Sequence, residues 1–253
     1  MSTSERDIMG GLAKGLTVIE TFTAERPRQS ISDVAAASGL DRATARRCLL
    51  TLAHHGYADY DGKFFTLTPR VLRLGTACLA AMPLPHMVQP WLDRLSEELG
   101  ESTSVSILDE DEIVYVARAA QRKVMSISLM PGSRLPAYCT SMGRVLLGAL
   151  PETEAQRRLS LRPLAARTGL TVTDPDAVMV RVRLAREQGF AVIDQEVELG
   201  LRSIAVPLVN ARGVTVAAVN LGLPAFGGEA ETLVARYLPA LSRIQGEIRK
   251  ILR

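Results

Sequence analysis

Residues 30–50 read SISDVAAASGLDRATARRCLL and contain the clearest structural signals in the first third of the chain. Ser30 followed by Asp33 is the start signal of a capping box. Gly39 suits a tight turn that needs a positive φ, and Asp41 offers a carboxylate to the first backbone N–H groups of a second helix. Two short helices joined by a tight turn predict a helix-turn-helix, which places one helix in the DNA major groove.

The second helix of this motif is predicted to be amphipathic. Its apolar residues recur at helical spacing and form one stripe, which consists of Ala45, Cys48, Leu49, Leu52 and Ala53. The opposite side carries Thr44, Arg47, Thr51 and His54, with Arg42 and Arg46 beside the N-terminal end. The N-terminal half of this helix is therefore free to face a ligand with polar, basic side chains.

The flanking segments extend the motif to a winged helix. Residues 12–22 have apolar side chains at helical spacing and predict a preceding helix. Residues 57–67 read as two aromatic-rich strands around Asp61-Gly62, a strong hairpin signal. A hairpin directly after a recognition helix is the wing, and Lys63 lies at its tip.

The arginines of this region have two interpretations. Taken alone they are ordinary solvated helix charges, but the capped helices, the turn and the hairpin favour DNA contact. Arginine pairs with guanine through two hydrogen bonds and binds phosphate well. The predicted DNA-binding residues are Ser32, Arg42, Ala43, Thr44, Arg46, Arg47, Thr51 and Lys63. Helix geometry favours Arg47 and Thr44 as groove-facing, with Arg42 or Arg46 nearer the DNA backbone.

Composition limits the class of protein. The chain has 253 residues, 47% hydrophobic content and a net charge of +3, and it has no apolar run long enough for a membrane span. The polar N-terminus is not a secretory signal, so we expect a cytoplasmic protein without a membrane partner. Three scattered cysteines and three histidines form no metal-binding pattern, so we expect reduced thiols and no metal or cofactor.

The sequence divides at a proline pair. Pro69 starts a helix that continues towards Ala81, and Met82-Pro83-Leu84-Pro85 is expected to break it. We therefore expect a winged helix-turn-helix domain over 1–68, a linker helix over 69–84 and a second domain over 85–253.

The second domain alternates helices and strands, which predicts a mixed α+β fold with helices on a sheet. Predicted helices cover 88–99, 141–150, 152–161, 174–188 and 229–252. Predicted strands cover 102–108, 113–119, 124–129, 190–194, 202–209 and 214–221.

Two segments of this domain predict a small-anion pocket. Residues 133–144 place small polar side chains at a helix start, and residues 199–203 add an arginine and a serine before a strand. The alternative is that Arg202 only pairs with Glu196 or Glu198 to hold a loop. Cys139 is a candidate nucleophile and the two glutamates a candidate acid–base pair, but a core cysteine and a loop charge cluster explain them more simply.

The whole layout resembles the IclR family of bacterial transcriptional regulators. The resemblance rests on DRATARR at 41–47, GSRLPAYCTSMGR at 132–144 and DQEVELGLRSIA at 194–205. These motifs look like the branch that controls aromatic-acid catabolism through protocatechuate and β-ketoadipate. The resemblance implies a GAF-like C-terminal effector-binding domain and dimers that pair into tetramers.

The resemblance also implies an effector cleft beside the sheet. Its lining residues, matched position by position, are Ile127, Leu135, Ser141, Met142, Ile193, Leu201, Ser203, Asn220 and Gly222. Members that bind small keto acids have an acidic residue in place of Ile193 and a hydroxyl in place of Gly222. A roomier, more apolar pocket favours an aromatic or dicarboxylic acid of the protocatechuate, 4-hydroxybenzoate or β-ketoadipate class. Arg118 and Arg134 are the candidate partners of its carboxylates.

These observations predict a sequence-specific DNA-binding regulator controlled by a small organic acid, and no enzyme. An enzyme with an accessory DNA-docking domain is the alternative, but it needs a nucleophile–base pair that this sequence does not offer. A nucleoid-type protein would need widespread basic surface, which a net charge of +3 does not supply.

Overall fold

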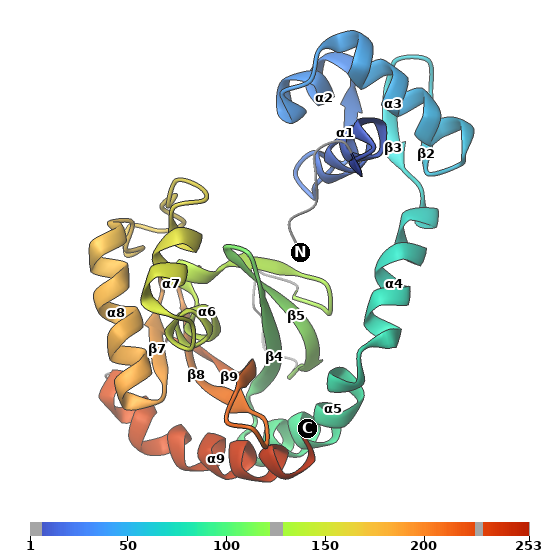
Figure 1. The fold of residues 1–253 in the computed structure, drawn as a ribbon. Coiled ribbons are helices and arrows are strands. Elements are labelled where there is room, and N and C mark those ends of the chain that lie inside the picture. Colours follow the sequence, from blue (N-terminus) through green and yellow to red (C-terminus); the bar gives the residue numbers. More distant parts are fainter. Residues whose placement is uncertain (1–6, 122–128, 226–229, 253) are drawn as a thin grey trace. The chain divides into compact units, whose positions relative to one another are not determined.

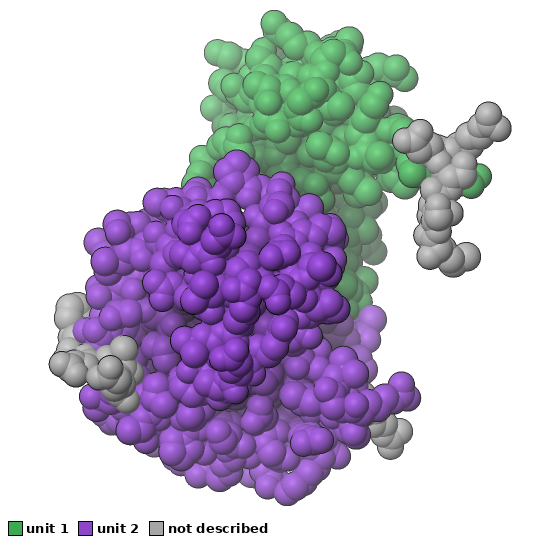
Figure 2. Space-filling view, turned by 60° about the vertical axis from the view of Figure 1, so that its left-hand side comes forward, with its two compact units in different colours: residues 1–80 green, residues 81–253 purple. Residues whose placement is uncertain are grey.

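The computed structural model describes residues 7–121, 129–225 and 230–252. The chain forms two compact units, residues 1–80 and 81–253, which Figure 2 colours green and purple. Each unit has its own hydrophobic core, so each is described by itself.

Helices and a small antiparallel sheet make up the described part of the first unit (Figure 1). Its helices are α1 (Gly10–Glu20), α2 (Ile31–Ser38) and α3 (Arg42–His54). Its strands, in spatial order, are β1 (Arg28–Ser30), β3 (Phe64–Leu67) and β2 (Ala58–Tyr60). The core joins all three helices to the hairpin through the fully buried side chains of Val18, Val34, Ala45, Leu49 and Phe65.

The helix-turn-helix forms as its caps predict. Ser30 Oγ accepts from the Asp33 N–H at 3.3 Å, and Asp33 Oδ2 accepts from the Ser30 N–H at 2.8 Å. Gly39 ends α2 with a φ of 69°, and Asp41 Oδ1 accepts from the Thr44 N–H at 2.9 Å to start α3. The capped ends fix where α2 stops and α3 begins.

The wing is a β2–β3 hairpin whose turn is held by Asp61. Its Oδ1 accepts from the backbone N–H groups of Lys63 and Phe64 at 2.9 and 2.8 Å, and Gly62 has a φ of 101°. The third strand, β1, pairs with β3 and was not expected. A strand of three residues is too short to show the alternation that predicts a strand.

The segment after the wing is helical. A 3₁₀ turn, η2 (Pro69–Val71), leads into α4 (Leu72–Ala81), none of whose residues is buried. The expected break is confined to Met82, because α5 (Pro83–Leu99) already begins at Pro83 and not at Val88. The first turn of a helix tolerates prolines, since its N–H groups have no partner within the helix.

Among the described helices, none is by itself long and apolar enough to cross a membrane. The segments 69–81 and 83–99 meet that criterion only when taken together, and they are bent by 76° relative to each other.

The second unit is built on a six-stranded antiparallel sheet. Its strands, in spatial order, are β6 (Arg134–Pro136), β5 (Glu112–Ala119), β4 (Ser102–Asp109), β9 (Thr215–Pro224), β8 (Leu201–Val209) and β7 (Ala191–Asp194). Strands and helices in one unit confirm the α+β prediction. β6 was not expected, and residues 124–128 of the predicted strand 124–129 lie outside the described residues.

Helices cover both faces of this sheet (Figure 1). α5 and α9 (Ala230–Ile251) lie on one face, and α6 (Ser141–Gly148), α7 (Glu152–Leu159) and α8 (Pro175–Gln188) on the other. β4 shows how the sequence divides these faces. Thr103 donates to the Leu92 carbonyl of α5, whereas Ser106, on the opposite face, contacts Met142 of α6.

The short helix α6 lies deep in this unit, with all of its residues buried. Thr140 Oγ1 caps it by accepting from the Gly143 N–H at 3.1 Å. A Cβ at Gly143 would lie 2.2 Å from the Ala137 carbonyl oxygen, so only glycine allows this approach. The start of α6 therefore packs closely against the turn that follows β6, and its first residues line a cavity.

Candidate functional site

The N-terminal half of α3 presents an exposed basic surface. Arg42, Arg46 and Arg47 are exposed, and no ion pair joins them to any residue that the structure describes. Thr51 is also exposed, and its hydroxyl donates to the Arg47 carbonyl oxygen at 2.8 Å. The buried side of the same helix holds Ala45 and Leu49 in the core. Cationic side chains without an internal partner are available to bind phosphate or base edges.

The other predicted DNA-binding residues lie on the same unit. Ser32 and Ala43 are exposed near the starts of α2 and α3, and Thr44 is half-buried. Lys63 is exposed at the tip of the wing, with its ammonium 5.0 Å from the centre of the Phe64 ring. Contact of these residues with DNA stays a prediction.

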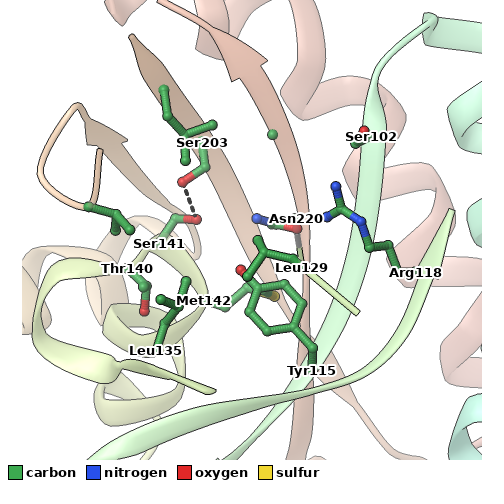
Figure 3. A pocket seen from close by; sticks show the side chains of 13 residues that line it. Ser102, Tyr115, Arg118, Leu129, Leu135, Thr140, Ser141, Met142, Ser203 and Asn220 are labelled. Carbon is green, nitrogen blue, oxygen red and sulfur yellow. Dashed lines mark hydrogen bonds between the residues drawn. The ribbon is translucent and has the colours of Figure 1, made fainter. Parts of the chain in front are cut away.

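The second unit contains a cavity between the sheet and the start of α6 (Figure 3). Its empty volume outside the protein atoms is about 440 Å³, and the cavity is partly open to solvent. Its described lining residues are Ser102, Tyr115, Arg118, Leu129, Leu135, Thr140, Ser141, Met142, Val197, Leu201, Ser203, Asn220 and Gly222.

A polar row crosses the floor of this cavity. Ser104 is the cross-strand partner of both Arg118 on β5 and Asn220 on β9, and directly paired residues share one face of a sheet. Arg118 Nη1 donates to Ser104 Oγ at 3.0 Å. Asn220 is 8% exposed, and its buried Oδ1 has no hydrogen-bond partner in the described structure. A guanidinium and an amide are thus held ready for a polar ligand.

Burial shapes the electrostatics of this row. It lowers the pKa of Arg118 below its ordinary value, but a guanidinium remains charged in proteins. Burial also raises the pKa of Tyr115 to about 12, so its hydroxyl stays protonated. No carboxylate within residues 7–121, 129–225 and 232–252 forms an ion pair with Arg118. A half-buried cation without a counter-charge favours an anionic ligand.

A second polar group lies at the α6 side of the cavity. The hydroxyls of Ser141 and Ser203 are 2.8 Å apart, and either oxygen can be the donor. Ser141 is the first residue of α6 and Ser203 lies on β8, so this contact joins the helix to the sheet. Figure 3 shows the pair on the opposite side of Asn220 from Arg118.

The structure brings most of the expected pocket residues together. The predicted residues that line the cavity are Arg118, Leu135, Ser141, Met142, Leu201, Ser203, Asn220 and Gly222. Ile193 is buried and is the cross-strand partner of Ser203, but it does not line the cavity. Ile127 lies outside the described residues.

Arg134 requires a correction. It lies on β6 next to Leu135, and adjacent residues of a strand point to opposite faces. Its guanidinium pairs at 2.7 Å with Glu112 and at 2.7 Å with Asp109 on the exposed side. Arg134 is therefore outside the cavity, and the expectation that it holds an effector carboxylate is wrong.

Several lining residues were missed by the sequence analysis. They are Ser102, Tyr115, Leu129, Thr140 and Val197. The alternation of serines at 102, 104 and 106 of β4 was a signal for a polar sheet face. Thr140 was visible as a helix cap, but the strand register that brings Tyr115 to the cavity was not.

The simpler interpretations of the candidate catalytic groups hold. Cys139 is fully buried, and burial raises the pKa of its thiol to about 11, so it is a protonated core residue. Glu196 pairs with buried Arg144 at 2.8 Å. Arg202 pairs with Asp194 at 2.7 Å.

A winged helix with an exposed basic recognition helix, joined to a unit with a polar cavity, defines a DNA-binding regulator that responds to a small molecule. The IclR helix-turn-helix domain model matches residues 11–62, and the model of the bacterial transcriptional regulator IclR C-terminal domain matches residues 76–245. The chain belongs to the IclR family of transcriptional regulators.

Characterised relatives cover nearly the whole chain. The Pca regulon regulatory protein of Pseudomonas putida is 42% identical over 240 residues, which span 94% of this chain and 82% of that protein. The p-hydroxybenzoate hydroxylase transcriptional activator of Acinetobacter baylyi is 35% identical over 250 residues, or 97% of this chain and 92% of that protein.

Solved structures with bound aromatic acids have the same fold. The inducer-binding domain of the PobR transcription factor from Acinetobacter, a double mutant in complex with 3-hydroxybenzoic acid, has a TM-score of 0.63 and 31% identity. It covers 68% of this chain and 100% of that one. An IclR homologue from Microbacterium hydrocarbonoxydans, in complex with 4-hydroxybenzoate, has a TM-score of 0.73 and 26% identity. It covers 96% of this chain and 99% of that one.

Proposed function

We propose that this protein regulates the catabolism of aromatic compounds through the β-ketoadipate pathway, and that a small organic acid in the cavity controls its DNA binding. The similarity to the Pca regulon regulatory protein and to the p-hydroxybenzoate hydroxylase transcriptional activator, together with the aromatic acids in two related structures, supports this proposal. The effector belongs to the protocatechuate, 4-hydroxybenzoate or β-ketoadipate class.

The observation that carries the proposal is the position of Arg118. Its guanidinium lines the cavity and has a serine hydroxyl as its hydrogen-bond partner. Arginine binds a carboxylate through two parallel hydrogen bonds. Apolar side chains around it, among them Leu135 and Met142, supply the surface that an organic acid needs.

The two walls of the cavity give the effector a way to act. The lining includes Met142 of α6 and Leu201 of β8, so a bound acid would contact the helix and the sheet together. A ligand shifts an equilibrium by its differential affinity for two states, typically about 1–3 kcal/mol. The helix over 69–81 is the covalent route by which this difference reaches the DNA-binding unit.

On the DNA side, two recognition helices of a dimer would enter successive major grooves of a pseudo-palindromic operator. Arg42, Arg46 and Arg47 would supply base and phosphate contacts. We further propose a tetramer built from such dimers, a location in the cytoplasm, and the division into domains over 1–68 and 85–253.

Thermal melting of the full chain tests this function. The panel is protocatechuate, 4-hydroxybenzoate, β-ketoadipate, pyruvate and glyoxylate. A ligand at 100 times its dissociation constant stabilises the native state by about 2.7 kcal/mol, which raises the midpoint by several degrees. We expect that rise with one of the first three acids. A flat response to those three would refute the effector class.

A matched pair of variants localises the site. Arg118→Met should abolish the rise, because it removes the cation from the cavity. Arg134→Met removes an equally long cationic side chain that lies outside the cavity, so it should preserve the rise. An Arg118→Met protein that still responds would place the effector elsewhere.

A further inference from the structure

The cavity has two chemically different polar ends. At one end the Arg118 guanidinium carries a positive charge, and Ser104 Oγ holds it at 3.0 Å. At the other end Ser141 and Ser203 share one hydrogen bond of 2.8 Å. One of the two serine hydroxyls donates within the pair, so the other keeps its proton free for a ligand, and oxygen lone pairs remain to accept. The first end suits an anion and the second suits a neutral hydroxyl.

Strand register sets the separation of these ends. The Arg118 guanidinium reaches Ser104 on β4, and Ser104, Asn220 and Ala205 lie in line across β4, β9 and β8. Ser203 is two residues along β8 from Ala205. Two strand spacings across and two residues along the sheet put the Cα atoms of Ser104 and Ser203 about 12 Å apart.

A para-hydroxybenzoate has a reach of the same order. Its carboxylate oxygens lie about 6 Å from its hydroxyl, and a hydrogen bond of about 2.8 Å at each end extends the reach to about 12 Å. Gly222 also lines the cavity without a side chain, and a Cβ there would meet only Ser102 O at 4.0 Å.

We infer that the Ser141–Ser203 pair recognises the para-hydroxyl group of a benzoic acid whose carboxylate is bound by Arg118. This inference rests on the proposed function and narrows its effector class to para-hydroxylated benzoates.

Calorimetric titration of the full-length protein with 4-hydroxybenzoate and benzoate tests the inference. These acids differ only in the para-hydroxyl group, so the ratio of their dissociation constants isolates it. The wild-type protein should bind 4-hydroxybenzoate about tenfold more tightly, which is the scale of one buried hydrogen bond. Equal affinities would overturn the inference, and no binding of either acid would instead overturn the proposed effector class.

Substitution of one serine should remove the preference. Ser203→Ala should bring the affinity for 4-hydroxybenzoate to within about twofold of that for benzoate, because the hydroxyl that distinguishes the two acids is removed. Ser141→Ala should have the same effect, and it leaves intact the hydrogen bond by which Thr140 caps α6. A variant that keeps the tenfold ratio contradicts the inference.

Ser160→Ala is the control. Ser160 does not line the cavity, and its hydroxyl donates to the Gln156 carbonyl oxygen of α7 at 2.9 Å. The control should keep the tenfold ratio, and thermal midpoints show that each variant is folded.

Arg118→Met decides the orientation of the ligand. This variant should weaken the binding of both acids by a similar large factor, because both acids present their carboxylate to the Arg118 side chain. If Ser203→Ala instead weakens benzoate and Arg118→Met removes only the hydroxyl preference, the acid binds the other way round and the inference fails.

Discussion

Arg144 and Glu196 form an ion pair in the interior of the effector-binding unit. Arg144 Nη2 lies 2.8 Å from Glu196 Oε2, and the two side chains are only 4% and 8% exposed. Glu196 Oε2 also accepts from the Val172 N–H at 3.1 Å, and Arg144 Nε donates to the Tyr138 carbonyl oxygen at 3.0 Å. The pair therefore ties α6 to the segment before β8, and both of these elements line the cavity.

Removing one partner of this pair should destabilise the protein strongly. Glu196→Gln leaves the Arg144 charge buried without a counter-charge, and such losses reach about 3–5 kcal/mol. Urea unfolding measures the change. The control is Glu98→Gln, which removes the partner of Arg243 in a pair whose side chains are 54% and 47% exposed. Exposed pairs contribute at most about 1 kcal/mol, so similar losses in the two variants would contradict the assignment.

Gly143→Ala should unfold or severely destabilise the second unit. The added Cβ would lie 2.2 Å from the carbonyl oxygen and 2.4 Å from the Cα of Ala137, both of them backbone atoms. Gly75→Ala is the matched control in α4, where a Cβ meets nothing within 4 Å. Alanine there should stabilise the helix by up to about 1 kcal/mol. Circular dichroism melting compares the two variants, and a neutral Gly143→Ala would show that the approach is looser than described.

The arginines of α3 should differ in their effect on DNA binding. If Arg47 contacts a base, Arg47→Ala should reduce the binding free energy for the preferred DNA by about 1–3 kcal/mol. The variant should also discriminate less between DNA sequences. If Arg46 contacts phosphate, Arg46→Ala should weaken binding to all DNA sequences alike. It should also reduce the slope of log affinity against log salt concentration by about one in magnitude. Arg26→Ala changes an exposed arginine outside α3 and is the control. Wild-type affinity and salt slope in both α3 variants would refute this interface.

The winged unit should lose stability in acid. Hydrogen bonds from Ser30 and from Thr44 hold the pKa values of Asp33 and Asp41 below the ordinary 3.8. Carboxyls with a lowered pKa in the folded state stabilise it above pH 3.8, and this contribution is lost as the pH falls through the folded values. The melting temperature should therefore decrease as the pH is lowered below about 4.

The double variant Asp33→Asn, Asp41→Asn tests the cause of that fall. Asparagine keeps an acceptor for the cap but does not titrate. Its midpoint should depend less on pH between 5 and 3 than that of the wild-type protein. An identical dependence would assign the acid sensitivity to other groups.

Local chemistry made much of the fold predictable. The caps at Ser30 and Asp41, the turn at Gly39 and the hairpin at Asp61-Gly62 each act over a few neighbouring residues, and the structure contains all of them. The two missed strands, β1 and β6, have three residues each. Their position depends on pairing with β3 and β5, which no local pattern reveals.

The cavity was predictable only in part, because its lining depends on which residues pair across neighbouring strands and on which face of the sheet each side chain occupies. The resemblance to a family supplied residues such as Ser141, Ser203 and Asn220. It did not separate Leu135, which lines the cavity, from its neighbour Arg134, which does not. A hydrogen bond between Ser141 and Ser203 joins residues 62 positions apart, and the sequence contains no signal for it.

The dissociation constant for DNA, measured with and without 4-hydroxybenzoate, tests whether an acid in the cavity controls DNA binding. The DNA is a duplex that the full-length protein itself selects from a random-sequence pool. We expect preferential binding to that duplex and a change in the dissociation constant of about fivefold or more when the acid is added. Arg118→Met should bind the same DNA with an affinity that does not depend on the acid. An unchanged DNA affinity of the wild-type protein at saturating acid would show that this acid does not control DNA binding.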